Sequence, residues 1–101
     1  MKVYKTMHGE GKAQIEHQLS DTRFLRLSAM RNHTRLLVVK ATCYTLDGNF
    51  EVFSPSQDYS KTVAALEVKR ITAKTVETTL QMYLPTLQEH VDAAKKHYNI
   101  Q

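Results

Sequence analysis

Residues 35–55, RLLVVKATCYTLDGNFEVFSP, constrain the fold more than any other part of the chain. Two runs rich in β-branched and aromatic residues lie on either side of Asp47-Gly48. An Asp-Gly pair in this setting favours a two-residue hairpin turn, because such turns need the positive φ that glycine adopts easily. The stretch therefore predicts a β-hairpin in which Thr45 lies opposite Phe50.

Both faces of this predicted hairpin carry apolar side chains. Side chains alternate across a strand, which assigns one set to a core face: Leu37, Val39, Ala41, Cys43, Phe50 and Val52. The opposite, outward face also holds apolar residues beside polar ones: Leu36, Val38, Lys40, Thr42, Tyr44, Glu51 and Phe53. Pro55 has no backbone donor and is expected to end the second strand.

The preceding residues predict further strands. Residues 2–8 and 13–19 alternate on either side of Gly9-Glu10-Gly11, a pattern typical of a hairpin. Residues 23–31 fit a strand or a helix capped at Ser20. The strand is favoured, because a three-residue loop at 32–34 pairs Ala29 with Leu37 and brings the two core faces together.

The last part of the chain predicts helices. Residues 59–71 fit a short helix, with a strand as the alternative. Beyond them, apolar residues recur every three or four positions in one stripe: Val76, Leu80, Tyr83, Leu84, Leu87, Val91, Ala94 and Tyr98. Thr72 or Thr75 is suited to cap this helix, and Pro85 predicts a kink or break near residues 81–84.

Strands first and helices last indicate the α+β class. We therefore expect residues 1–101 to form a single domain, an antiparallel meander sheet of four or five strands with a C-terminal helix kinked at Pro85. The single cysteine, Cys43, excludes an intramolecular disulfide and favours a reducing compartment. The N-terminus lacks the apolar core of a signal peptide, and no apolar run approaches membrane-spanning length. A cytoplasmic protein without membrane contact is expected.

The residues that could act in catalysis or bind a metal form no recognised motif, so we expect no enzyme activity, cofactor or metal. Of the five histidines, His90 and His97 lie seven residues apart on the predicted helix, about 10 Å along its axis and too far to share an ion. Surface or boundary positions are expected for the histidines. Glu89 and Asp92 fit a solvated helix face beside Lys95 and Lys96.

The whole chain has a net charge of +4, and its positive charge is concentrated in the first half of the sequence. The cations of the predicted strands are Arg23, Arg26, Arg31, Arg35 and Lys40. With Phe24 beside them, they could bind the phosphates of a single-stranded nucleic acid while the aromatic ring stacks on a base. Nucleic-acid binding is therefore the alternative function.

The preferred function follows from the outward face of the sheet. One helix can cover only one face, and the other would expose an apolar patch larger than a monomer usually leaves open: Phe24, Met30, Leu36, Val38, Tyr44 and Phe53. Residues 59–71 could fold over this patch. Otherwise it predicts a non-catalytic protein-interaction module, an adaptor, chaperone-like or inhibitory protein that binds a protein partner and forms a homodimer.

Overall fold

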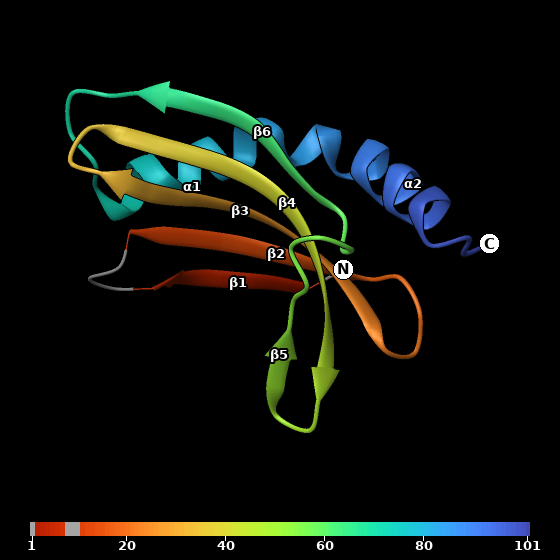
Figure 1. Ribbon diagram of the computed structural model, residues 1–101. Helices are drawn as coiled ribbons and strands as arrows, with labels where there is room; N and C mark the ends of the chain where they lie inside the picture. The colour runs from red at the N-terminus through yellow and green to blue at the C-terminus, as the bar shows by residue number, and fades with distance from the viewer. Residues whose placement is uncertain (1, 8–10) are drawn as a thin grey trace.

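The computed structural model of the chain describes the backbone of residues 2–7 and 11–101 and the side chains of residues 11–101. Six strands form one antiparallel sheet, followed by two α-helices joined by a 3₁₀ turn (Figure 1). The strands are β1 (Lys2–Met7), β2 (Lys12–Gln18), β3 (Arg23–His33), β4 (Leu36–Asp47), β5 (Phe50–Val52) and β6 (Ser60–Glu67). The helical elements are α1 (Ala73–Tyr83), η1 (Leu84–Thr86) and α2 (Leu87–His97).

Strands β1 to β4 are neighbours in sequence order, so this part of the sheet is a meander. Strands β5 and β6 both pair with β4. Because β5 pairs with the end of β4 and β6 with its beginning, both strands lie along the same edge of β4. This arrangement confirms the predicted α+β class, with the strands grouped in one antiparallel sheet and the helices at the C-terminus.

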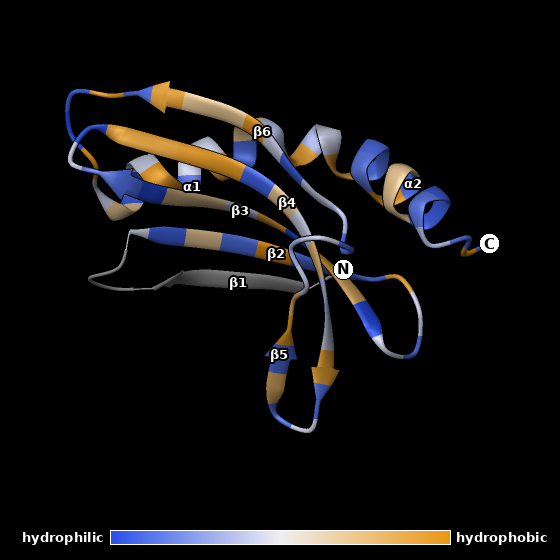
Figure 2. Ribbon diagram, viewed as in Figure 1, coloured by the Kyte–Doolittle hydropathy of each residue, from blue (hydrophilic) through white to orange (hydrophobic). Residues whose placement is uncertain are grey.

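Both helices lie on the same face of the sheet, which we call the inner face (Figure 1). Hydrophobic segments of the strands and helices meet there (Figure 2). The buried core consists of Ala13, Ile15, Leu19, Leu25, Leu27, Ala29, Leu37, Val39, Ala41, Cys43, Val76, Leu80, Leu87, Val91 and Ala94. Four of the six residues predicted for the core face of the central hairpin are in this set. Neither α1 nor α2 packs on the opposite face, which is called the outer face below (Figure 1).

Residues 23–31 belong to strand β3, which confirms the strand and excludes the helix. The register with β4 differs from the prediction by two residues, because Ala29 lies opposite Val39 and not Leu37. The turn is at Thr34-Arg35 and an irregularity occurs between Arg31 and His33. A shift of two residues keeps every side chain on its face. The residues predicted for the core face of β3 and β4 are therefore correct although the predicted register is wrong.

The central hairpin turns one residue later than predicted. Asp47 still belongs to β4 and pairs with Phe50, which leaves Gly48-Asn49 as the loop. Gly48 has a φ of 62°, which an L side chain rarely adopts. The strand β5 ends at Val52, before Pro55. Phe50 and Val52 are exposed and not in the core, because this hairpin projects beyond the helices that would bury them (Figure 1).

The helix predicted for residues 59–71 is wrong, because the structure places strand β6 there. The apolar spacing of this stretch fits both structures, and pairing with β4 satisfies its backbone. Since β6 extends the sheet at its edge, it does not fold over the outer face.

The C-terminal helical region begins as predicted at Thr72, whose hydroxyl accepts a hydrogen bond from the Thr75 backbone N–H at 3.2 Å. The α-helical pattern is interrupted at η1, where Pro85 lacks the N–H needed to continue it. The region is therefore divided into α1 and α2. The predicted change in axis direction at Pro85 stays a prediction.

The surface or boundary position expected for the histidines is wrong for His90, which is buried. Its side chain is only 5% exposed on α2, and Nε2 has no hydrogen-bond partner among the described residues. Burial lowers the pKa of His90, and the nearby positive charge of Lys61 lowers it further, against a smaller opposing effect of Glu89. The folded protein therefore holds a neutral imidazole.

We expect acid to destabilise the protein through His90. The unfolded state has the ordinary histidine pKa of 6.5 and binds a proton more readily than the folded state. Stability should therefore be complete above pH 6.5 and fall as the pH drops towards the lowered folded pKa. Urea unfolding at pH 7.5 and pH 5.5 should show a smaller loss for His90→Leu than for the wild type. Equal losses would show that another group causes the effect; burial also lowers the pKa of His17.

Candidate interaction surface

The outer face is divided into a polar cluster and an apolar groove. The polar cluster is centred on Arg26 of β3, which lies opposite Glu16 of β2 and Thr42 of β4. Its guanidinium donates to Glu16 Oε1 at 2.9 Å and to Glu51 Oε1 at 3.0 Å. It also lies 4.5 Å from the centre of the Tyr44 ring, and the Tyr44 hydroxyl donates to Glu16 Oε2.

These contacts fix the charges of the polar cluster. Burial opposes the charge of Arg26, but the hydrogen bonds to Glu51 and Glu16 outweigh it and raise the arginine pKa. The hydrogen bond from Arg26 lowers the pKa of Glu51. Burial, followed by the hydrogen bond to Glu16, raises the pKa of Tyr44. The cluster thus remains an ion-pair network at neutral pH, with a neutral tyrosine that is a poor proton donor for catalysis.

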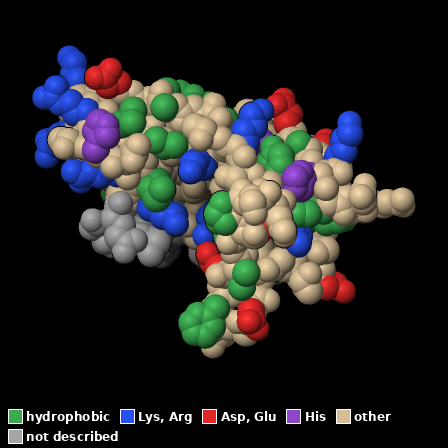
Figure 3. All heavy atoms as spheres, in the orientation of Figure 1, with side chains coloured by type: hydrophobic (Ala, Val, Ile, Leu, Met, Phe, Trp, Pro, Cys, Tyr) green, Lys and Arg blue, Asp and Glu red, His purple; other side chains and the backbone are tan. Residues whose placement is uncertain are grey.

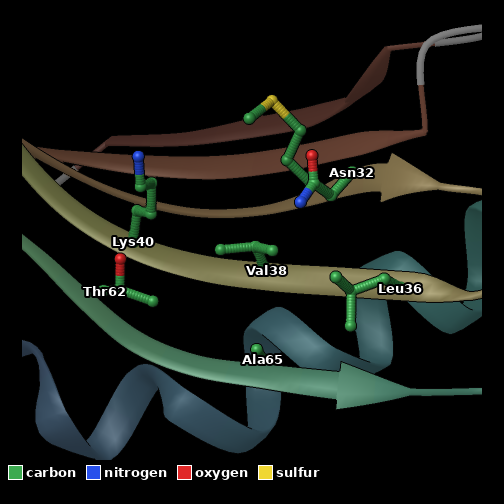
Figure 4. Close-up of a pocket in the computed structure, with 7 residues that line it drawn as sticks. Asn32, Leu36, Val38, Lys40, Thr62 and Ala65 are labelled. Atoms are coloured by element: carbon green, nitrogen blue, oxygen red, sulfur yellow. The ribbon is translucent and has the colours of Figure 1, made fainter.

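An apolar groove of about 350 Å³ lies beside the polar cluster, towards the β3–β4 turn (Figure 4). Its lining residues come from β3, β4 and β6: Met30, Asn32, Leu36, Val38, Lys40, Thr62 and Ala65. Figure 4 shows Leu36, Val38 and Ala65 together, with Lys40 and Thr62 at one end. Four of the seven lining residues are apolar, and the polar ones are Asn32, Thr62 and the cation Lys40.

The hairpin formed by the end of β4 and by β5 projects from the sheet; we call residues 45–53 the arm (Figure 1). Its large apolar side chains are exposed: Leu46, Phe50, Val52 and Phe53. Phe50 is 76% exposed, the highest value among the exposed large hydrophobic residues described. Hydrophobic and acidic side chains share the arm in the space-filling view (Figure 3).

The six residues predicted to form one interface patch fall into three separate places. Met30, Leu36 and Val38 line the groove. Phe24 and Tyr44 stack with ring centres 5.6 Å apart at the other end, where Tyr44 is buried beside Arg26. Phe53 belongs to the arm.

The five cations of the nucleic-acid alternative are likewise separated. Arg23 pairs with Asp58 at 2.8 Å and lies over the Tyr98 ring, and Arg26 is held by two glutamates. Lys40 lines the groove. Only Arg31 and Arg35 are exposed near the β3–β4 turn, at the end of the molecule where Figure 3 shows Lys and Arg side chains gathered.

Three parts of this surface were not predicted from sequence. Ala65 and Thr62 reach the groove because β6 is a strand and not a helix. Phe50 was assigned to the core. The pairing of Glu16 with Arg26 depends on the register between β2 and β3. The alternation in β2 predicts which face Glu16 is on, but it does not predict this register.

The other residues considered as sites in the sequence were Cys43, the histidines, Glu89 and Asp92. Cys43 is fully buried, as predicted, and burial raises its pKa to about 11, which disfavours the reactive thiolate. Within the described residues, no group of three or more His, Cys, Asp or Glu side chains is arranged to bind a metal. His8 lies outside the described residues. Glu89 and Asp92 are exposed on α2, as expected.

Comparison with protein-family models, curated proteins and solved structures finds no significant match to this chain. In the part of the chain that the structure describes, neither helix has the length and hydrophobicity required to cross a lipid bilayer.

Proposed function

We propose that this protein is a small, non-catalytic protein-interaction module that works as a homodimer in the cytoplasm and uses its outer face as the contact surface. The observation that carries the proposal is the placement of both helices on the inner face. The outer face keeps an apolar groove near the beginning of β4, and the arm at the end of β4 exposes large hydrophobic side chains. Grouped exposed apolar surface is typical of interaction sites.

The amount of exposed surface supports the same proposal. The chain exposes 6800 Å² and measures 41 × 27 × 26 Å. A compact monomer of 11.6 kDa exposes about 5800 Å² according to the usual scaling with mass. The excess of about 1000 Å² is comparable to the roughly 800 Å² that each partner buries in a standard interface.

Placing a charge in the groove should disrupt the homodimer. We expect Val38→Lys to weaken dimerisation by at least about tenfold, since desolvating a lysine in an apolar contact is costly. Sedimentation equilibrium over a micromolar concentration series measures the effect, and circular dichroism checks that the variant is folded.

Met82→Lys is the matched control, because Met82 is an exposed apolar residue on α1, away from the outer face. It should dimerise like the wild type. A wild-type protein that stays monomeric across the series would contradict the proposed function.

Nucleic-acid binding is the second candidate, and the exposed Arg31 and Arg35 favour it. The case is weaker because carboxylates of the same molecule already neutralise Arg23 and Arg26. Purification with and without nuclease separates the two functions, and binding to nucleic acid must weaken steeply as salt is raised.

A further inference from the structure

Five cations lie at the end of the sheet that carries the β3–β4 turn, and we call them the cationic end. They are Lys12 at the start of β2, Arg31 near the end of β3, Arg35 in the turn, and Lys69 and Arg70 in the connection between β6 and α1. Figure 3 shows Lys and Arg side chains gathered at this end of the molecule. We propose that the cationic end binds the phosphate backbone of double-stranded nucleic acid. The inference gives the second candidate function a site and a ligand, and it does not depend on the homodimer.

Backbone hydrogen bonds hold these positions side by side. The Val68 N–H donates to the Arg35 carbonyl at 2.9 Å, so the connection after β6 starts beside the β3–β4 turn. The Arg31 N–H donates to the Gly11 carbonyl at 2.9 Å, so the start of β2 lies beside the end of β3. Neighbouring strands are about 4.8 Å apart, which spreads the ends of β2, β3, β4 and β6 over roughly 14 Å.

The charge of the cationic end is not neutralised by the described residues. In the part of the chain that the structure describes, the salt bridges are made by Arg23 and Arg26, and none involves these five cations. The segments 31–35 and 67–72 contain four Lys or Arg residues and one acidic residue, Glu67. This end of the molecule can therefore attract an anionic ligand.

The side chains of the cationic end suit a duplex better than a single strand. Three of the five cations are arginines, whose guanidinium group can donate to two phosphate oxygens at once. Single strands are held mainly by bases that stack on aromatic rings, but Phe24 is stacked on Tyr44 at the far end of the outer face. A duplex carries one phosphate charge per roughly 1.7 Å of its axis, so a surface about 14 Å wide faces about eight charges.

The scarcity of exposed apolar side chains near the cationic end favours nucleic acid over a protein or a membrane. Of the exposed large hydrophobic residues described, four are on the arm and Met82 is near the far end of α1. Met30, which pairs with Lys12, is the one beside the cationic end. Protein contacts and membrane surfaces are usually held by clustered apolar side chains as well as by charge.

The double variant Lys69→Gln/Arg70→Gln tests the site, because both residues are exposed in a connection between elements. Fluorescence anisotropy with labelled duplex DNA measures the affinity over a series of salt concentrations. Each phosphate contact contributes about −0.9 to the slope of log affinity against log salt, so we expect a wild-type slope of about −3 to −5. The double variant should bind about tenfold more weakly at low salt, with a slope less steep by about two.

Lys95→Gln/Lys96→Gln is the matched control, because it removes the same charge from the last turn of α2, at the opposite end of the molecule (Figure 1). It should bind like the wild type, and circular dichroism checks that both variants are folded. Equal losses in the two variants, no binding at low salt, or tighter binding to phosphatidylserine vesicles than to the duplex would each overturn the inference. A monomer that binds the duplex through Lys69 and Arg70 would support it and contradict only the homodimer.

Discussion

Replacing Arg26 with methionine is expected to lower the free energy of unfolding by about 2 kcal/mol, between the values for exposed and fully buried ion pairs, because the pair with Glu16 is mostly but not fully buried. The change leaves Glu16, whose side chain is 12% exposed, without its cation. It also removes the partner of the more exposed Glu51. Urea unfolding at pH 7 measures the loss, because the lowered pKa of Glu51 keeps its carboxylate ionised at this pH in the wild type.

Two further variants identify the cause of this loss. Arg31→Met removes an exposed arginine of the same strand and should change stability by less than about 0.5 kcal/mol. The double variant Arg26→Met/Glu16→Gln should recover part of the loss, since the uncompensated buried charge is then gone. A double variant no more stable than Arg26→Met would mean that packing of the guanidinium on Tyr44, and not charge, is responsible.

The pH dependence of this network follows from Glu51. The hydrogen bond from Arg26 lowers its folded pKa below the ordinary value of 4.5. The contribution of Glu51 to stability is therefore complete above about pH 4.5 and is lost as the pH falls through the folded pKa. Arg26→Met should flatten this acid limb of the stability curve. The loss from His90 begins as the pH falls below 6.5, and the loss from Glu51 begins only below about pH 4.5. Comparing the His90→Leu and Arg26→Met variants separates the two effects.

Replacing Leu27 with alanine is expected to cost about 3 kcal/mol, within the range for a large-to-small change in a core. Leu27 is fully buried at the centre of the sheet, between Ile15 of β2 and Ala41 of β4. The surrounding strands cannot collapse into the cavity without disturbing their hydrogen bonds. Chemical unfolding monitored by circular dichroism measures the change.

Leu46→Ala is the matched control, because it removes the same atoms from an exposed position on the arm. We expect a change within about 0.5 kcal/mol. If Leu27→Ala were as mild as Leu46→Ala, the inner face would not be the core of the protein.

The sequence predicted the strands near the N-terminus well because period-2 alternation depends on only one buried face. The preference for a strand over a helix at residues 23–31 was correct for this reason. Registers were less accurate: the β3–β4 and β4–β5 pairings both differ by two residues from the prediction. Each shift preserved the faces, so Leu37, Val39, Ala41 and Cys43 were still assigned to the core correctly.

The sequence predicted an apolar outer face, but it did not predict all the residues that form the candidate surface. Alternation assigned Met30, Leu36 and Val38 to the outer face, where they line the groove. It also assigned Phe50 to the core, since alternation gives the direction of a side chain but not what lies above it. The helices end before the arm, so Phe50 meets no partner within its own chain. The same limit explains His90, which lies on the buried side of α2.

The first four strands, the two-sided apolar character of the sheet and the interruption of the C-terminal helical region at Pro85 were determined by local sequence, because they depend on periodicity and on the missing proline donor. Only the tertiary structure decided which cations are neutralised, that residues 60–67 join the sheet edge, and that the hairpin of residues 45–53 projects beyond the helices. Those features depend on contacts between residues distant in the chain, such as Arg26 with Glu51, and periodicity does not encode such contacts.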